Sequence, residues 1–438
     1  MILRAIVDIL VRMALVKWRL PHLRWTTPPV ALLFVKSFYP IVPYLLLSFL
    51  GCTRPKPEGT GWQERLLDKI PDGVQASGTT CSSDGKRAAY VAWEKDKWYA
   101  VVDGKRGPSF AFITDFQMSA DWNRVAYCAN RGGELRSGPA RVTGGSWFTV
   151  VDGHEGEAFD GVGSLCLNPG GTHLAYAAKR ENKWFAVLDG KPINPQDEVR
   201  DIALSADGRA IAYSAHESLP HDDQAKLYGN KWFVVARGKK GERFDYVADL
   251  ILSPDGKTVA YAAATDVEAD ASGNIKHGRF FVVVGEEKGE EFDYVGRLSF
   301  SADGKIVAYI ARKAGKAFIV SGKTRLRDEE WVGHWPVFSP DGKSVAYTAM
   351  KKGQWTVVLD GRENGSFRGI SSNPIFSPDG KVLTFIAEEG GKEFVVVGDK
   401  KGPEFDQAFM PVFSANGAQV GYGARLGSDL WWKVISLH

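Results

Sequence analysis

The protein has 438 residues, among them 48 Gly, 24 Phe, 14 Tyr and 14 Trp, a mixture that is typical of many short strands joined by tight turns. The formal net charge is only +3, and basic and acidic residues are interspersed through the body of the chain. The sequence therefore has no basic face that could follow nucleic-acid phosphates, and we expect no nucleic-acid partner.

The first 52 residues differ from the rest of the chain. They contain six Lys and Arg residues and one acid, Asp8, and then run into the apolar stretch SFYPIVPYLLLSFLGC, which ends at Cys52. A basic region, a short apolar core and a small residue form the layout of a secretory signal. The ending resembles a bacterial lipoprotein signal, in which Cys52 would become the lipidated first residue. An uncleaved membrane anchor and a mis-assigned start are the alternatives.

We therefore expect a signal or anchor over 1–52 and a linker over 53–64. The body of the chain is then expected on the periplasmic side of the cell envelope, held at the membrane by the N-terminal lipid or anchor.

The other three cysteines are Cys81, Cys128 and Cys166. They show no CxxC spacing, so the sequence indicates neither a metal knuckle nor a disulfide framework. Each lies in an apolar, strand-like run, where a small buried residue is expected.

A pattern typified by FSPDGKSVAYTA at 338–349 occurs nine times between residue 80 and the C-terminus. Its Asp position recurs every 37 to 49 residues, at Asp84, Asp121, Gly170, Asp207, Asp255, Asp303, Asp341, Asp379 and Asn416. A period near 40 made of strand-like segments predicts propeller blades rather than helical repeats. We expect a β-propeller over 65–438, with units that begin near 80, 117, 166, 203, 251, 299, 337, 375 and 412.

Each unit is interpreted as four strands. The first ends at the Ser of the motif, and SPDG forms a turn in which Pro presets one backbone angle and Gly takes a positive one. The second strand is VAYxA, the third is an aromatic and valine run such as WFVVA at 232–236, and the fourth is short, as in EFDYV at 291–295.

The last unit ends after its third strand, and a strand-like segment at 66–74 precedes the first unit. We expect this N-terminal segment to supply the missing fourth strand, because closing the ring removes the open sheet edges. The predicted fold is all-β, a single propeller of four-stranded antiparallel blades. Nine blades are expected, and eight blades with a partial extra unit are the alternative.

The repeated motif resembles the WD-repeat-like propeller repeat of the bacterial TolB-type family over residues 80–438. The resemblance implies the propeller fold, and the shared residues are turn and core positions. TolB-type proteins resemble a six-bladed propeller behind an N-terminal α/β domain, whereas about 25 residues separate Cys52 from the first unit here. The Tol-system role is therefore not carried over.

Three units depart from the repeat in the loop between the second and third strands. The aromatic of the second strand lies 8 or 9 residues before the aromatic that opens the third in six units, but 19 or 20 residues before it in units two, four and five. The inserts are polar and lie at 130–145, 216–230 and 265–278. Because these loops all leave a propeller on the face opposite the SPDG turns, we expect one binding face. Its candidate residues are Arg131, Arg136, Arg141, His216, His221, Asp222, Asp223, Asp266, Glu268, Asp270 and His277.

The inserts also contain potential metal ligands, namely His216, His221, Asp222 and His277. DVEADASGN at 266–274 lacks the glycine and the final acid of a calcium loop, which are replaced by Ala271 and His277. We therefore assign no metal and no cofactor. The sequence contains no G-x-S-x-G elbow, P-loop or HExxH motif.

The sequence thus predicts a non-catalytic propeller of the cell envelope that binds a protein or peptide, or a glycan, through the insert-bearing face. One alternative is a metal-dependent envelope enzyme that uses the His and Asp residues of the inserts. The other is a structural scaffold within an envelope complex.

Overall fold

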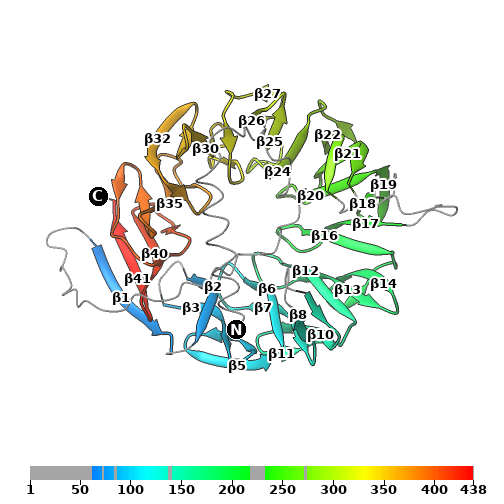
Figure 1. The fold of residues 1–438 in the computed structure, drawn as a ribbon, viewed down its shortest axis with the longest axis horizontal. Helices are drawn as coiled ribbons and strands as arrows, with labels where there is room; N and C mark the ends of the chain where they lie inside the picture. The colour runs from blue at the N-terminus through cyan, green and yellow to red at the C-terminus, as the bar shows by residue number, and fades with distance from the viewer. Residues whose placement is uncertain are drawn as a thin grey trace, which may run out of the picture.

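The computed structural model describes residues 62–71, 74–82, 86–136, 141–217, 232–270 and 274–437. All regular secondary structure in these ranges is β-strand. The strands form nine antiparallel sheets of four or five strands around a common axis, with one additional two-stranded hairpin (Figure 1). The prediction of an all-β propeller with nine blades is confirmed, and the eight-bladed alternative is wrong. None of the described segments forms a helix that could cross a membrane.

Blades 1 to 6 each follow chain order from the axis to the rim. Blade 1 consists of β2 (Gln75–Cys81), β3 (Ala88–Glu94), β4 (Lys97–Val102) and β5 (Lys105–Phe110), and blade 2 of β6 (Phe112–Met118), β7 (Val125–Arg131), β10 (Ser146–Val151) and β11 (His154–Glu155). Blade 3 consists of β12 (Gly161–Leu167), β13 (Leu174–Arg180), β14 (Lys183–Leu188) and β15 (Lys191–Pro192), and blade 4 of β16 (Glu198–Leu204), β17 (Ile211–His216), β18 (Trp232–Ala236) and β19 (Lys239–Phe244). Blade 5 consists of β20 (Tyr246–Leu252), β21 (Val259–Ala269), β22 (Ile275–Val284) and β23 (Glu287–Lys288), and blade 6 of β24 (Tyr294–Phe300), β25 (Val307–Lys313), β26 (Lys316–Ser321) and β27 (Thr324–Arg325).

In blades 7 to 9 the innermost strand is split into two short pieces. Blade 7 consists of β28 (Trp331–Val332), β29 (Val337–Phe338), β30 (Val345–Lys351), β31 (Gln354–Leu359) and β32 (Arg362–Phe367). Blade 8 consists of β33 (Gly369–Ile370), β34 (Ile375–Phe376), β35 (Leu383–Glu389), β36 (Lys392–Val397) and β37 (Lys400–Lys401). Blade 9 contains β38 (Gln407–Ala408), β39 (Val412–Phe413), β40 (Gln419–Leu426) and β41 (Asp429–Ser436). Pro336, Pro374 and Pro411 directly precede the second pieces. Proline has no N–H to donate to the ladder, which explains the interruption.

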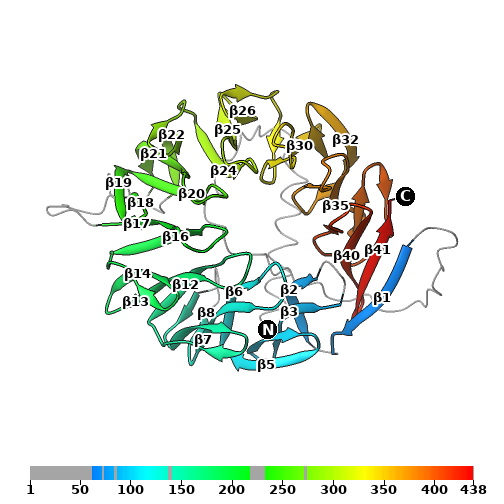
Figure 2. The same cartoon turned by 180° about the vertical axis from the view of Figure 1, so that it is seen from behind.

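The N-terminal strand closes the ring. β1 (Trp62–Lys69) pairs antiparallel with β41, from Trp62 opposite Ile435 to Lys69 opposite Asp429, and thereby completes blade 9. Lys433 forms an ion pair with Glu64 across this joint. Both views along the axis show β1 beside β41 at the rim (Figure 2). The predicted closure by an N-terminal strand is confirmed, but the strand spans Trp62–Lys69 rather than residues 66–74.

The motif turn is held by the same hydrogen bonds in blade after blade. In blade 5 the Ser253 hydroxyl donates to Asp255 Oδ1 (2.7 Å) and accepts the Thr258 N–H (2.9 Å), while Asp255 Oδ1 also accepts the Lys257 N–H (3.0 Å). Gly256 adopts φ +66°, a conformation that glycine takes without steric cost. The recurring Ser and Asp therefore build a turn.

Neighbouring blades pack against each other through pairs of aromatic side chains. The motif aromatic of every second strand is buried. In six joints it packs against a Phe from the rim side of the preceding blade, with ring centroids 5.6 to 6.3 Å apart, as in Phe292 with Tyr309. Burial of these paired rings contributes apolar contact between neighbouring blades, beside the aliphatic residues of the same clusters.

The interpretation of EFDYV at 291–295 as a fourth strand is wrong. The fourth strand of blade 5 is β23, and Phe292 only adds an isolated bridge to Phe280. The Asp293 N–H then bonds the Arg312 carbonyl of blade 6, and Tyr294 begins β24. The apolar pattern runs across the boundary because both sides of it pack in the same joint.

Candidate binding surface

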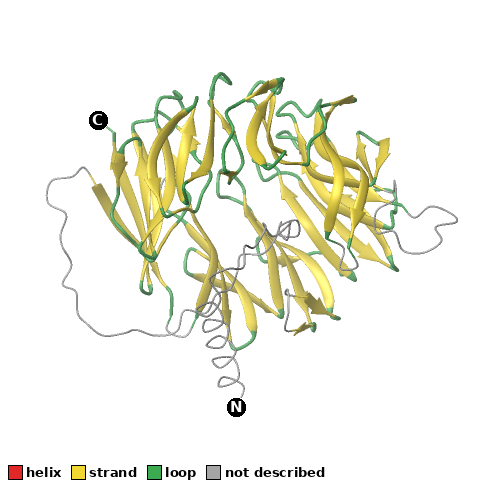
Figure 3. Ribbon diagram, turned by 45° about the horizontal axis from the view of Figure 1, so that its top comes forward, coloured by secondary structure: helices red, strands yellow, loops and turns green. Residues whose placement is uncertain are grey.

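Three blades carry extensions between their second and third strands. In blade 2 a small hairpin of β8 (Glu134–Arg136) and β9 (Arg141–Thr143) is inserted between β7 and β10. In blade 5, β21 and β22 continue beyond the length of their counterparts in the other blades. In blade 4 the described chain ends at Glu217 and resumes at Trp232. In blades 2 and 5 the extension follows the second strand, whereas the motif turn precedes it, so the two lie at opposite ends of that strand. Figure 3 shows loops joining the strands at both ends of the blades (Figure 3).

The fold does not require these extensions. Blade 7 joins its second and third strands through only Lys352 (φ +51°) and Gly353 (φ +76°), and blade 3 does so through Glu181 (φ +49°) and Asn182 (φ +64°). Two residues with positive φ form a type I′ turn, whose twist matches that of the flanking strands. The extensions therefore lengthen hairpins that a two-residue turn would be sufficient to close.

The extension of blade 2 has a rigid root. Asn130 is fully buried, and its side chain accepts the Gly133 N–H (2.9 Å) and donates to the Gly144 carbonyl (3.2 Å). A Cβ on Gly133 would lie 2.3 Å from the Asn130 amide, so only glycine fits there. Leu135, opposite Val142 in the hairpin, is 43% exposed. The hairpin thus presents an aliphatic side chain from a fixed base.

The predicted arginines of this extension have different environments. Arg131 lies at the end of β7 and pairs with Glu155 (2.5 Å). Arg136 and Arg141 face each other in the register of β8 and β9, and their side chains lie outside the described part of the structure.

The extension of blade 5 is anchored by apolar residues and lined by charges. Ile275 is buried in the cluster shared with blade 6. Arg279 donates from Nε to Asp266 (2.6 Å) and from Nη1 to Glu291 (3.1 Å). These partners raise the pKa of Arg279 and keep it charged.

The remaining predicted residues of blade 5 lie further along the same hairpin. Glu268 stands opposite His277, and Asp270 caps the tip by accepting the N–H (3.0 Å) and side-chain amide (3.1 Å) of Asn274. The structure thus brings Asp266, Glu268, Asp270 and His277 together on one hairpin.

The described stem of the blade 4 extension is also ordered by specific contacts. His216 lies against Trp232 with ring centroids 5.2 Å apart. Glu217 pairs with Arg243 (2.5 Å) and Lys240 (3.1 Å), and hydrogen bonds from both lower its pKa. His221, Asp222, Asp223 and the predicted lipidation site Cys52 lie outside the described residues.

Potential metal ligands are dispersed on this surface. In the described part of the chain, no group of three or more His, Cys, Asp and Glu side chains converges in a way that could hold an ion. Cys128 is buried and Cys166 half-buried, and both are free thiols. Burial raises the pKa of the Cys128 thiol well above its ordinary value.

Sequence reasoning missed a group of residues on the inner strands. Trp335 precedes Pro336 in the interrupted inner strand of blade 7 and is 38% exposed, with the Arg297 guanidinium 4.8 Å from its ring centroid. Nε2 of the adjacent His334 lies 2.8 Å from the Ile370 carbonyl, and burial lowers the pKa of this imidazole. The Pro-Val/Ile-Phe-Ser pattern of the last three units was the available signal.

Comparisons with known proteins assign neither a family nor a function to this chain. No protein-family model matches the chain, and no curated protein matches it. A solved eukaryotic initiation factor is 12% identical, covers 76% of this chain and 88% of its own, and has a TM-score of 0.49. An oligogalacturonate lyase in complex with manganese is 12% identical, with coverage of 87% and 94% and a TM-score of 0.39. TolB from Acinetobacter baumannii is 12% identical, with coverage of 72% and 80% and a TM-score of 0.29. Similarity at this level concerns the fold alone.

Proposed function

We propose that this propeller is a non-catalytic binding protein that captures a protein or peptide through the face bearing the three extensions. The observation that supports this most strongly is that the extensions are dispensable for closing their hairpins and yet are built on fixed roots, at Asn130 in blade 2 and Ile275 in blade 5. Loops held on a rigid scaffold are the usual location of binding residues.

The chemistry of the extensions favours a protein partner. The described part presents Arg131 and the exposed aliphatic Leu135 on blade 2, and the charges of both signs of Asp266 and Arg279 on blade 5. A mixture of apolar and charged side chains is the ordinary composition of a protein interface. Several of these charges are already paired within the chain, so they would orient a partner more than they would strengthen its binding.

The proposal places the protein in the cell envelope. The support is the basic and then apolar N-terminal segment that ends at Cys52. If Cys52 is lipidated, Cys52→Ala abolishes globomycin-sensitive processing and releases the protein from the membrane fraction. Unchanged membrane attachment of Cys52→Ala would support an uncleaved anchor instead.

The binding face is tested by shortening the extensions to the turn of blade 7. Residues 132–145, 218–230 and 266–278 are each replaced by Lys-Gly. The flanking pairs Arg131–Ser146 and Thr265–Arg279 occupy the register positions of Lys351 and Gln354, and the replacement in blade 4 leaves the pair His216–Trp232 in place. Crosslinked capture from envelope extracts, quantified by mass spectrometry, should lose the proteins enriched by the wild type. Substitution of Lys343, an exposed residue of a motif turn, by Glu is the control and should retain them. Retention of the same partners by the shortened protein would show that the assigned face is wrong.

The metal-dependent alternative has one observation in its favour, the position of His277 opposite Glu268. Metal analysis of the purified protein separates the two proposals. Stoichiometric zinc or calcium that is lost in His277→Ala would favour the alternative, whereas unchanged metal content in His277→Ala would not.

A further inference from the structure

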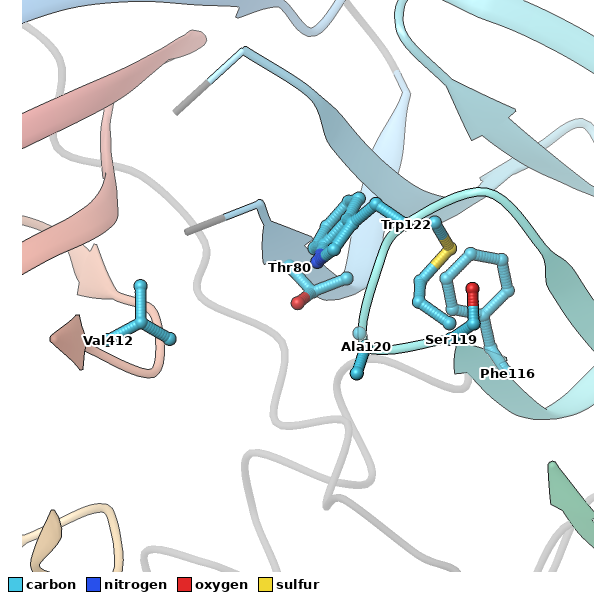
Figure 4. Close-up of a pocket in the computed structure, with 8 residues that line it drawn as sticks. Thr80, Phe116, Ser119, Ala120, Trp122 and Val412 are labelled. Carbon is cyan, nitrogen blue, oxygen red and sulfur yellow. The ribbon is translucent and has the colours of Figure 1, made fainter. Parts of the chain in front are cut away.

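A pocket of about 450 Å³ lies between blades 9, 1 and 2, at the motif-turn end of their inner strands. Its walls come from β2 of blade 1, from β6 and the motif turn of blade 2, and from β39 of blade 9. Figure 4 shows Trp122 turned toward Thr80, with Phe116, Ser119 and Ala120 on the same side and Val412 across the opening (Figure 4). The volume falls in the range of small-molecule sites, roughly 300–1,000 Å³.

Trp122 occupies a backbone position that the repeat otherwise gives to glycine. The corresponding residues of blades 3 to 9 have φ between +66° and +74°, and they are Gly171, Gly208, Gly256, Gly304, Gly342, Gly380 and Gly417. Trp122 has φ +62°. A bulky residue in this conformation is strained, and such strain persists where the surrounding structure enforces it.

At Gly171, Gly208 and Gly256 close packing between turns also requires glycine. A Cβ on Gly256 would lie 2.8 Å from Ser205 Cβ, and one on Gly208 would lie 2.2 Å from the His173 ring. The Trp122 carbonyl accepts a hydrogen bond from Arg87, as the Gly256 carbonyl accepts one from Arg237. Only the side chain of Trp122 differs, and it lines the pocket.

The pocket combines an aromatic surface with neutral polar groups. Phe116, Met118, Val412 and the indole of Trp122 are apolar, and no charged side chain lines the described pocket. The Ser119 hydroxyl is engaged by Asp121 (2.6 Å) and by the Arg124 N–H (3.0 Å). The Thr80 hydroxyl and the Trp122 indole N–H make no hydrogen bond to the described residues, so both can serve a ligand.

We propose that this pocket binds a neutral sugar ring, which stacks on Trp122 and bonds the Thr80 hydroxyl and the indole N–H through its own hydroxyl groups. The absence of lining charges disfavours an ionic ligand. A purely aliphatic guest would leave the two polar groups desolvated and unpaired, which is unfavourable. A sugar ring offers an apolar C–H face and hydroxyl groups together. This inference is independent of the insert-bearing face, which lies at the other end of the blades.

The test is isothermal titration calorimetry of the full-length protein with neutral trisaccharides, namely cellotriose, maltotriose and tri-N-acetylchitotriose. Trigalacturonate is the anionic comparator, and a short leucine-rich peptide is the apolar one. At least one neutral trisaccharide should bind, and its Kd should rise at least tenfold in Trp122→Gly. Because glycine is the residue that this turn position takes in seven other blades, Trp122→Gly should keep the thermal midpoint of the wild type or raise it.

A second variant covers the outcome in which Trp122→Gly does not fold. Thr80→Val preserves the shape of the side chain and removes the hydroxyl, so the Kd for the same trisaccharide should rise several-fold with an unchanged thermal midpoint. The proposal is overturned if none of the neutral trisaccharides binds the wild type, if only trigalacturonate or the peptide binds, or if both variants that fold bind the trisaccharide like the wild type.

Discussion

The face formed by the motif turns and the face that carries the extensions differ in how far one blade repeats another. On the turn face, Ser253 and Asp255 have equivalents with the same bonds in blade after blade. Where the residue type changes, the bond remains: Asn168 Oδ1 accepts the His173 N–H (2.8 Å), and Asn416 Oδ1 accepts the Ala418 N–H (3.1 Å). On the other face, six blades turn within a few residues and three extend.

This difference separates residues that the fold requires from residues that it does not. A hydrogen bond that survives a change of side chain serves the geometry of the turn, and a catalytic acid would not tolerate replacement by Asn. The extensions have no counterpart in the other six blades, and the ring is closed elsewhere, by the pairing of β1 with β41. On the turn face, the corresponding departure from the repeat is Trp122, which stands in place of the turn glycine. In both cases, the break in the repeat identifies the candidate site.

The largest expected effect is the loss of stability when the aromatic contact between blades 5 and 6 is removed. Phe292 is buried and packs against Tyr309 and Phe318, with ring centroids 6.3 and 5.8 Å away. Phe292→Ala should lower the free energy of unfolding by about 3–5 kcal/mol, because it leaves a cavity between blades 5 and 6. Urea denaturation measures this. Leu426→Ala, at a 49% exposed position, is the control and should change stability by less than about 0.5 kcal/mol. Similar losses in the two variants would contradict the assigned core.

The second-largest loss of stability is expected when the serine of a motif turn is replaced. Ser253 is 1% exposed, and Ser253→Ala removes the acceptor of the buried Thr258 N–H, so stability should fall by about 1–3 kcal/mol. Ser253→Asn should be milder, because Asn168 bonds the equivalent N–H in blade 3. If Ser253→Asn and Ser253→Ala lower the free energy of unfolding in urea equally, the turn does not depend on an acceptor at this position.

A smaller effect is expected on the insert-bearing face. Replacement of 266–278 by Lys-Gly should change the free energy of unfolding by about 1 kcal/mol or less, because Ile275 is the only buried residue among those that the structure describes in this segment, and the shortened hairpin closes as in blade 7. The measurement is urea denaturation beside Ser253→Ala. A loss larger than that of Ser253→Ala would mean that the extension supports the fold.

The smallest effect is the contribution of a single turn carboxylate to pH dependence. Hydrogen bonds from Ser253 and the Lys257 N–H lower the pKa of Asp255 from 3.8 to about 2. The folded state therefore favours the carboxylate, so its contribution is complete above pH 3.8 and is lost as the pH falls through about 2. Asp255→Asn keeps the acceptor and removes the titration. The wild type should lose slightly more stability than Asp255→Asn between pH 5 and pH 2.5, and equal losses would contradict the assignment.

The sequence predicted the blades and the closure of the ring because turn and core positions repeat in register. The same regularity hid the blade boundary within residues 291–295, since Phe292 and Tyr294 serve different blades but the same joint. It could not reveal the pocket, because Val412 belongs to blade 9, which only ring closure brings beside Thr80 of blade 1 and Trp122 of blade 2. Tryptophan in place of the turn glycine was visible in the second unit, but its meaning depends on φ and on the neighbouring turns.

The most direct test of the central claim is to place a photo-crosslinking amino acid at Leu135 on the blade 2 extension and, separately, at Lys343 on a motif turn of blade 7. Both positions are exposed, so the two proteins should fold alike. Irradiation in cells should give a discrete protein adduct from position 135 and none from position 343. An adduct from position 343 with none from position 135 would contradict the assignment of binding to the insert-bearing face.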